Sequence, residues 1–110
     1  MLNENDFRDR ASEMIEDLEE KLLPISEEHD FEVETAEGIL TIIFEDPAPA
    51  KFIVSPNTPA RQIWVSALST SFKFDWDEAQ GTFVLDKSRE PFLKVMADLI
   101  SKPLGTPVSL

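Results

Sequence analysis

The chain has no cysteine, no tyrosine and one histidine, His29, among its 110 residues. The absence of cysteine excludes disulfides, thiolate metal sites and cysteine nucleophiles, and it fits a reducing cytosol. No apolar run approaches the ~20 residues that a membrane span needs. The first ten residues, MLNENDFRDR, are polar and acidic, unlike a targeting segment, so we expect a cytoplasmic protein that acts where it is made.

Basic residues are also scarce, with 10 Lys and Arg against 22 Asp and Glu and a net charge of −12. Nucleic acids and anionic membranes are bound through basic patches, so neither is an expected partner. Residues 1–34 hold 13 acids and 3 bases, which is ten of the twelve net negative charges. A chain of this length has room for one core of ordinary size, so we expect a single domain over residues 1–110.

The acidic segment predicts an amphipathic helix. Apolar residues recur at spacings of 3, 4 and 7 from Phe7 to Leu22, and Pro24 is expected to end the helix. The acids on the opposite side form what we call the acidic ridge: Asp6, Asp9, Glu13, Glu16, Asp17 and Glu20. Like charges three or four residues apart oppose a helix by ~0.2–0.5 kcal/mol per pair, so the ridge has an energetic cost.

Six strands and a second helix are predicted after a polar loop that contains His29, an exposed residue with no expected role. The segment 30–35 alternates with period two and places Asp30, Glu32 and Glu34 on one face, and a tight turn leads into 39–44. Further strands are predicted at 51–55, 61–66, 72–76 and 82–85. The last helix is expected over 89–102, with Ser88 as N-cap and Pro91 in its first turn, before a tail that packs in an extended form or frays.

This order of elements predicts an α+β fold, a two-layer sandwich with both helices on one face of an antiparallel six-stranded sheet. The other face of such a sheet lies in solvent. In the segment 61–66, Ile63 and Val65 would then face the helices, while Gln62 and Trp64 face water. Tryptophan is a favoured interface anchor, although single exposed aromatic residues also occur on inert surfaces.

Several segments together resemble the frataxin family, in particular its bacterial CyaY-like branch. They are the first helix, the acidic strand, GILTIIF, NTPARQIWVS, FKFDW and the closing helix, so that the resemblance runs from Phe7 to Ile100. The motif TP..QIW, with FDW about ten residues later, carries most of it. The sequence departs from the branch in two ways: Leu23 and Pro24 stand where further acids are common, and Ser55 stands where Asn is frequent.

The resemblance implies the α-β6-α frataxin fold and an iron-binding regulator of iron–sulfur cluster assembly, a monomer without metal. It implies weak binding of Fe²⁺ or Fe³⁺, with other divalent cations as substitutes, at exposed carboxylates: Glu13, Glu16, Asp17, Glu19, Glu20, Asp30 and Glu32. These acids would also engage a cysteine desulfurase. The exposed sheet face would engage the iron–sulfur scaffold protein through a second set of residues: Ser55, Asn57, Arg61, Gln62, Trp64 and Lys73.

Other interpretations of the same residues stay open. An acidic helix face is commonly just a solvated face, and no spacing here builds a closed metal cage, so a metal site would be open and partly hydrated. The segment DWDEAQG imitates a calcium loop but has Gln80 where glycine is needed, which favours a turn. No catalytic set is evident, although counting acids does not exclude a paired-carboxylate hydrolase. The alternatives to the iron-binding regulator are a metal-independent acidic interaction module and, more weakly, an enzyme that oxidises ferrous iron.

Overall fold

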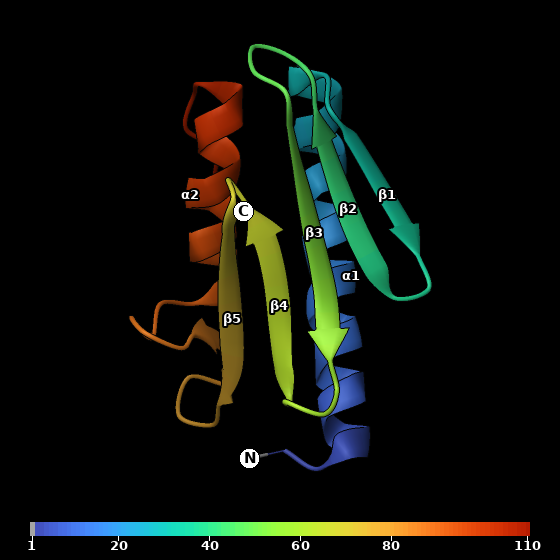
Figure 1. Ribbon diagram of the computed structural model, residues 1–110, viewed down its shortest axis with the longest axis vertical. Helices are drawn as coiled ribbons and strands as arrows, with labels where there is room; N and C mark the ends of the chain where they lie inside the picture. The colour runs from blue at the N-terminus through green and yellow to red at the C-terminus, as the bar shows by residue number, and fades with distance from the viewer. Residues whose placement is uncertain (1) are drawn as a thin grey trace.

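Two helices and one six-stranded antiparallel sheet form the described part of the computed structural model, residues 2–110 (Figure 1). The elements, in chain order, are α1 Glu4–His29, β1 Glu32–Ala36, β2 Ile39–Phe44, β3 Ala50–Asn57, β4 Gln62–Ala67, β5 Thr70–Asp77, β6 Thr82–Leu85 and α2 Phe92–Leu104. The strands neighbour one another in chain order, with β1 and β6 at the two edges. The predicted α+β fold is confirmed. Within residues 2–110, neither helix has the length and hydropathy needed to cross a bilayer.

Two short turns fix the register of the sheet. Glu37 and Gly38 join β1 to β2 with φ angles of 52° and 79°, and Leu68 and Ser69 join β4 to β5 with 52° and 60°. Positive φ at both central residues gives the turn a twist that matches that of the flanking strands. The β4–β5 turn therefore sets which side chains of β4 and β5 lie opposite each other.

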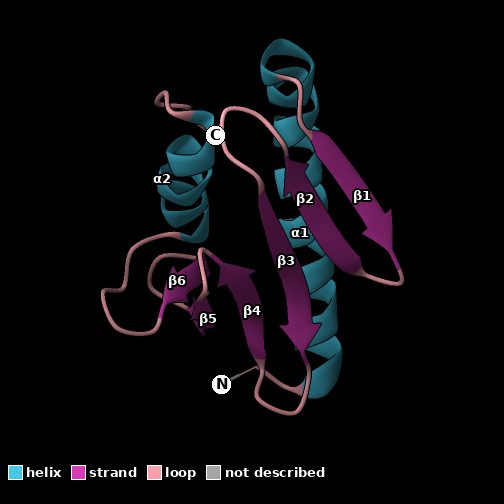
Figure 2. Cartoon of the chain, turned by 45° about the horizontal axis from the view of Figure 1, so that its top comes forward, coloured by secondary structure: helices cyan, strands magenta, loops and turns pink. Residues whose placement is uncertain are grey.

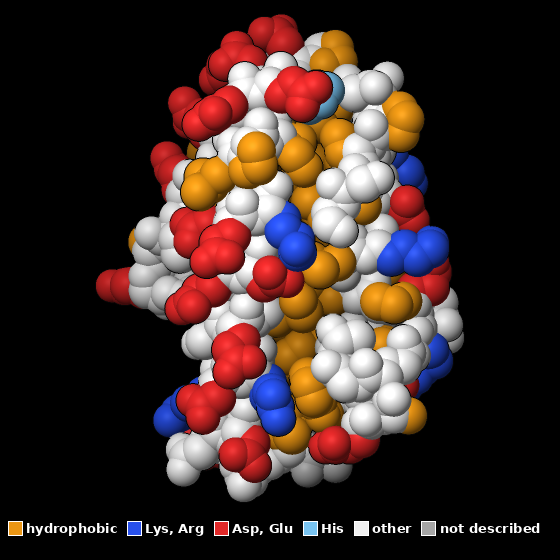
Figure 3. All heavy atoms as spheres, turned by 180° about the vertical axis from the view of Figure 1, so that it is seen from behind, with side chains coloured by type: hydrophobic (Ala, Val, Ile, Leu, Met, Phe, Trp, Pro, Cys, Tyr) orange, Lys and Arg blue, Asp and Glu red, His pale blue; other side chains and the backbone are white. Residues whose placement is uncertain are grey.

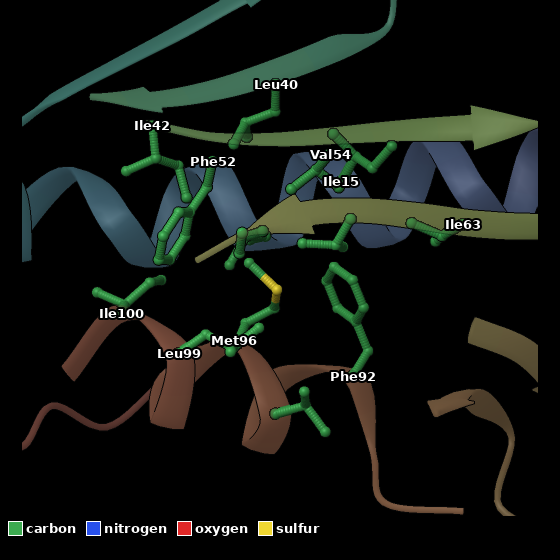
Figure 4. Close-up of a cluster of buried hydrophobic side chains, with 14 of the residues drawn as sticks. Ile15, Leu40, Ile42, Phe52, Val54, Ile63, Phe92, Met96, Leu99 and Ile100 are labelled. Carbon is green, nitrogen blue, oxygen red and sulfur yellow. The ribbon is translucent and has the colours of Figure 1, made fainter. Parts of the chain in front are cut away.

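Both helices pack against the same face of the sheet. Figure 1 shows α1 behind β2 and β3, and Figure 2 shows α2 at the upper left, beyond the β5–β6 end of the sheet. Figure 4 shows Met96 and Phe92 of α2 pointing toward the sheet, and Ile15 of α1 and Phe52 of β3 belong to the same buried cluster. The predicted apolar stripe of α1 is buried apart from Met14, which is half-buried at the edge of the cluster, and α2 buries Phe92, Met96 and Ile100 in the same cluster. The opposite face, which we call the open face, carries no helix.

The prediction that Pro24 ends α1 is wrong, because the helix continues to His29. Proline removes one helical hydrogen bond and crowds the preceding turn. The helix can still continue where other contacts stabilise the turn after the proline. Here Ile25 packs against the core, and the N–H groups of Asp30 and Phe31 both donate to the Ser26 carbonyl. This end is a left-handed cap at Asp30, with a φ of 59°. His29 therefore ends a helix instead of lying in a loop.

The start of α2 also differs from the prediction, since the helix begins three residues after Arg89. Arg89 has a φ of 64°, which a right-handed helix does not contain. The chain from 89 to 91 bonds back to β6 instead, where the Leu85 N–H donates to the Glu90 carbonyl at 2.9 Å. The N-cap is Pro91, and Ser88 accepts a hydrogen bond from Glu90 N–H within the preceding turn.

The tail after α2 packs on the protein. The helix runs to Leu104 and ends at Gly105, whose φ of 68° is left-handed. Beyond it, Val108 N–H donates to Ser101 Oγ at 3.0 Å, and Val108 and Leu110 are half-buried against the core. Of the two predicted outcomes for the tail, the structure shows extended packing and not fraying.

Asp77 ties the β5–β6 turn to the segment before α2. Its carboxylate accepts hydrogen bonds from the backbone N–H groups of Ala79 and Gln80 and from the Arg89 guanidinium at 3.0 Å. The Gln80 N–H, followed by Arg89 and the Ala79 N–H, holds the pKa of Asp77 below its ordinary value. The segment DWDEAQG thus ends β5 in a turn at residues 78–81, which agrees with the prediction of a turn from Gln80.

We expect Asp77→Asn to lower the melting temperature near pH 6 and to have little effect near pH 2. A carboxylate whose folded pKa is depressed stabilises the fold above its unfolded pKa of about 4, and this contribution is lost as pH falls through the lower folded pKa. Thermal melts of both proteins across this range measure the gap between them. Glu78→Gln, at the exposed next position, is the control, and a gap for Asp77→Asn that persisted in acid would contradict the prediction.

Candidate functional site

The acidic ridge lies on the outer side of α1, where the sequence predicts it. Figure 3, viewed from the helix side, shows acidic side chains following one flank of the molecule along its length. Glu13, Glu16 and Glu20 are exposed, and Asp17 is half-buried, with its carboxylate 3.8 Å from the Lys21 ammonium. One i,i+4 ion pair at that distance does little to offset a row of like charges.

The acids of the first strand do not extend the ridge in a straight row. The Thr35 hydroxyl donates to the Glu19 carboxylate, which places Thr35 on the side of β1 that faces α1. Successive side chains of a strand point to opposite faces, so Glu32 and Glu34 lie on the open face instead. Asp30 is the cap of α1 and not a strand residue. The predicted metal residues therefore lie on both sides of edge strand β1.

No three acidic or histidine side chains within residues 2–110 are close enough together to hold one metal ion. Exposed carboxylates still offer the hard oxygen ligands that iron, magnesium and calcium accept. Single or paired carboxylates on a solvated surface leave most coordination positions to water. An ion bound there would be partly hydrated and open to exchange with solvent.

The ridge should destabilise the fold at low ionic strength. We expect the double substitution Glu16→Gln and Glu20→Gln to raise the free energy of unfolding by about 0.5–1.5 kcal/mol, because it removes three like-charge pairs on one helix face. Chemical denaturation in low salt measures the gain, which should shrink in high salt as the charges are screened. Glu4→Gln is the control, since Glu4 pairs with Arg8 at 2.5 Å and its loss should bring no gain. A double variant of unchanged or lower stability would show that the ridge carries no electrostatic cost.

Trp64 lies on the open face, as the alternation of β4 predicts. Its side chain is 38% exposed, whereas its neighbours Ile63 and Val65 are 0% and 1% exposed. The indole N–H donates to Gln62 Oε1 at 2.9 Å, and the Lys73 ammonium lies 5.0 Å from the centre of the ring. A cation at that distance from an indole face is attracted to it. The ring is therefore both exposed and held in one orientation.

Asp75 completes this arrangement, and the sequence analysis did not identify it. Gln62 Nε2 donates to Asp75 Oδ1 at 2.9 Å, and Gln62 lies directly opposite Asp75 in the β4–β5 register. The amide of Gln62 is thus fixed at both ends, by Asp75 and by Trp64. The signal was present in the sequence, since Asp75 has the same strand parity as Lys73, but it could be used only once the β4–β5 register was known.

The remaining predicted sheet residues divide into two groups. Ser55 lies opposite Trp64 in the β3–β4 register and belongs to the open face. Asn57 and Arg61 instead build the β3–β4 turn: Asn57 Oδ1 accepts from Ala60 N–H at 3.0 Å, and Arg61 has a φ of 56°. Arg61 was predicted as the first residue of a strand, which is wrong by one position because the chain is still turning there.

A shallow hollow of about 390 Å³ lies beside Trp64 on the open face. Its wall adds Ile53, Ser66 and Ser71 to the predicted residues Ser55, Trp64 and Lys73. Ile53 is 37% exposed and supplies apolar surface next to the indole. This surface has an aromatic ring, an aliphatic side chain and small hydroxyl groups at its centre, and charges around them. Protein-binding surfaces have the same composition.

Comparisons with known proteins agree with this architecture. Residues 1–106 match the family described as Frataxin-like domain. The iron-sulfur cluster assembly protein CyaY of Pseudomonas aeruginosa is 37% identical over 90 residues, which are 82% of this chain and 80% of that protein. The protein of the same name from Azotobacter vinelandii is 33% identical over 98 residues, 87% of each chain.

A solved structure of frataxin from Psychromonas ingrahamii, described as a model for stability modulation within the CyaY protein family, has the same fold. It superposes with a TM-score of 0.81 at 25% sequence identity and covers 98% of this chain and 97% of that one. The match to the family spans both helices and all six strands. The chain therefore belongs to the frataxin family.

Proposed function

We propose that the chain is an iron-carrying regulator of iron–sulfur cluster assembly. Its acidic ridge would carry the ion and engage a cysteine desulfurase, and its open face would engage the iron–sulfur scaffold protein. The family membership and the relatives named as cluster assembly proteins support this assignment. The observation that carries it is the exposed Trp64, held in place by Gln62 and Lys73 on a sheet face that no helix covers.

The two surfaces would have different tasks. An exposed row of like charges attracts a basic partner over a distance and speeds the encounter, while it contributes less to holding the complex together. A rigid aromatic ring beside a hollow buries area at little conformational cost and lengthens the life of the complex. We therefore propose that the ridge sets the association rate with the desulfurase and that the open face sets the dissociation rate from the scaffold.

Binding measurements with the separate partners test the proposal. The chain, the desulfurase and the scaffold of one organism would be purified and mixed in pairs at two salt concentrations. We expect binding of the desulfurase to weaken with salt and with the double variant Glu16→Gln and Glu20→Gln. Binding of the scaffold should instead depend on Trp64. The absence of binding to both partners, with and without ferrous iron, would overturn the proposal.

Iron, as cargo, should bind first along α1. We expect paramagnetic broadening of NMR signals by Fe²⁺, or by Mn²⁺ as a substitute, to begin at residues predicted for metal binding: Glu13, Glu16, Asp17, Glu20, Asp30 and Glu32. Carboxylates close in space raise the local concentration of cations even without a closed site. Asp77 and Glu78 of the β5–β6 turn, which are acids without a predicted metal role, are the internal comparison. Broadening centred on that turn would contradict the assignment.

A metal-independent interaction module is the second candidate, and one observation favours it. Within residues 2–110 no cluster of three metal-binding side chains exists, and exposed carboxylates attract a basic partner by their own charge. Anaerobic calorimetric titration with ferrous iron separates the two candidates. Heat from weak, saturable binding supports the iron carrier, whereas no heat together with full desulfurase binding supports the module. We propose no enzymatic activity, and a turnover assay for ferrous oxidation tests that point.

A further inference from the structure

A hollow of about 260 Å³ lies between α1 and the end of the sheet where β5 turns into β6. Glu13, Met14 and Asp17 of α1 are part of its wall on one side, and Trp76 and Thr82 of the sheet are part of it on the other. It shares no residue with the hollow on the open face. Met14 belongs to this wall, and its sulfur has a chemistry that the acids of the ridge do not have.

Met14 is the more accessible of the two methionines that the structure describes. It is half-buried at the edge of the core, whereas Met96 lies within the core and is 0% exposed. Met1 lies outside the described residues. The chain has no cysteine, so its methionines are the side chains that a peroxide oxidises reversibly. Of the two described methionines, Met14 is therefore the one at which this reaction should occur first.

The sulfur of Met14 already has a hydrogen-bond donor beside it. The Thr82 hydroxyl donates to Met14 Sδ at 3.6 Å, a contact that joins the first half of α1 to the start of β6. A thioether sulfur is a weak acceptor. An oxygen added to that sulfur carries a partial negative charge and accepts a stronger hydrogen bond from the same hydroxyl. The oxidised side chain would therefore keep a partner at the edge of the core, where an unpaired polar oxygen is costly.

The charge around the hollow favours an uncharged oxidant. Glu13 and Asp17 line the hollow, and the other acids of the ridge follow on the same helix. Carboxylates repel anionic oxidants such as hypochlorite and superoxide, but they do not repel hydrogen peroxide, which is neutral near pH 7. The reaction needs no metal at these acids, so it is independent of the proposed function.

We propose that Met14 is a reversible oxidation site, at which hydrogen peroxide converts the thioether to the sulfoxide and Thr82 holds the new oxygen. A lone pair of the sulfur attacks one peroxide oxygen, and the O–O bond breaks. The proton of the transferred oxygen goes to the departing hydroxide, which leaves as water. The sulfur is oxidised and the peroxide is reduced. The reverse reaction needs an external dithiol, which becomes a disulfide while the oxygen leaves as water.

Mass spectrometry after brief peroxide treatment of the folded protein tests the site. Trypsin places Met14 in residues 11–21 and Met96 in the segment that begins at Val95, so one digest reports on both. We expect the sulfoxide to form at Met14 at least about tenfold faster than at Met96, because Met96 becomes accessible only when the core opens. In concentrated urea the two rates should become similar. Equal rates in the folded protein would overturn the proposal.

Thermal melts of the oxidised protein test the consequence. Oxidation should lower the melting temperature of the wild type by about 4 °C or more, because a polar group replaces an apolar one at the edge of the core. Treatment with methionine sulfoxide reductases and dithiothreitol should restore the original value. A wild type whose melting temperature did not change when Met14 was oxidised would contradict the proposal.

Two variants separate this site from general oxidative damage. Met14→Leu keeps an apolar side chain of similar size and keeps Met96, so peroxide should leave its melting temperature unchanged. Thr82→Val lacks the donor, so oxidation should lower its melting temperature more than that of the wild type. If peroxide lowered the melting temperature of Met14→Leu as much as that of the wild type, or if Thr82→Val and the wild type lost equally, the proposal would be wrong.

Discussion

Replacing Ile63 with alanine should lower the free energy of unfolding by about 2–5 kcal/mol, whereas replacing its neighbour Trp64 should lower it by about 1 kcal/mol or less. The ranking runs against side-chain size, because the larger residue is the more dispensable one. Chemical denaturation of both variants measures the difference directly. The reversed ranking would mean that Trp64, and not Ile63, supports the core.

The reason lies in the faces of β4. Ile63 is fully buried beneath the two helices, and Figure 4 places it in the same cluster as Phe92 and Met96. Its truncation leaves a cavity that the close-packed surroundings fill only in part, so the lost contacts add to the lost transfer free energy. Trp64 packs against the pleated backbone and Lys73 on the open face, where water can replace what the ring covers.

Binding should show the opposite order. If the proposed function is right, Trp64→Ala should weaken association with the scaffold by at least ~1–2 kcal/mol, which is roughly five- to thirtyfold, while the circular dichroism spectrum stays unchanged. Ser66→Ala is a matched control, because Ser66 lines the same hollow and loses only a hydroxyl group. Equal, small effects of both variants on scaffold binding would show that the open face is not the interface.

The sheet could be predicted from the sequence because its physical signals are local. Alternation of apolar and polar residues places Ile63 and Val65 in the core without any knowledge of the neighbouring strands. Residues with special backbone demands, such as Gly38, mark a turn by themselves. The order of the strands then follows from short connections between neighbours in the chain.

The errors arose where a distant contact outweighed a local rule. Arg89 has good helix propensity, but its guanidinium and carbonyl are bound to the β5–β6 turn, so the backbone there takes another path. Arg61 continues the alternation of β4 in the sequence, yet its place in the turn follows from the capping by Asn57. Neither contact can be seen in a window of a few residues.

The candidate site divides in the same way. The ridge on α1 could be predicted because helical periodicity alone gathers acids on one side. The contribution of Asp75 to the orientation of Gln62 depends on the β4–β5 register. The position of Glu32 depends on which face of β1 lies toward α1, which the Thr35–Glu19 contact shows. Periodicity therefore locates a surface, whereas only tertiary pairing tells which side chains on it act together.

The continuation of α1 past Pro24 leads to a second large effect. Pro24→Ala should raise the free energy of unfolding by roughly 1–2 kcal/mol, because alanine restores the missing backbone N–H and removes a steric conflict that costs ~3 kcal/mol in a helix interior. Part of this gain is lost, since the unfolded chain becomes more flexible by ~0.4–1 kcal/mol without proline. Urea denaturation at constant m-value measures the net change.

Pro91→Ala is the matched control, with the opposite expected sign. Pro91 has a φ of −61° and an extended conformation at the N-cap of α2, which suits proline, so its replacement should cost ~0.4–1 kcal/mol through the unfolded state alone. Pro24 is exposed, so the change to alanine leaves no cavity. If Pro24→Ala instead destabilised the protein, the proline would be needed to direct the last turn of α1. In that turn Ile25 packs against the core, and the Ser26 carbonyl accepts both capping N–H groups. A higher free energy of unfolding for Pro24→Ala would show that these contacts hold the turn although the proline destabilises it.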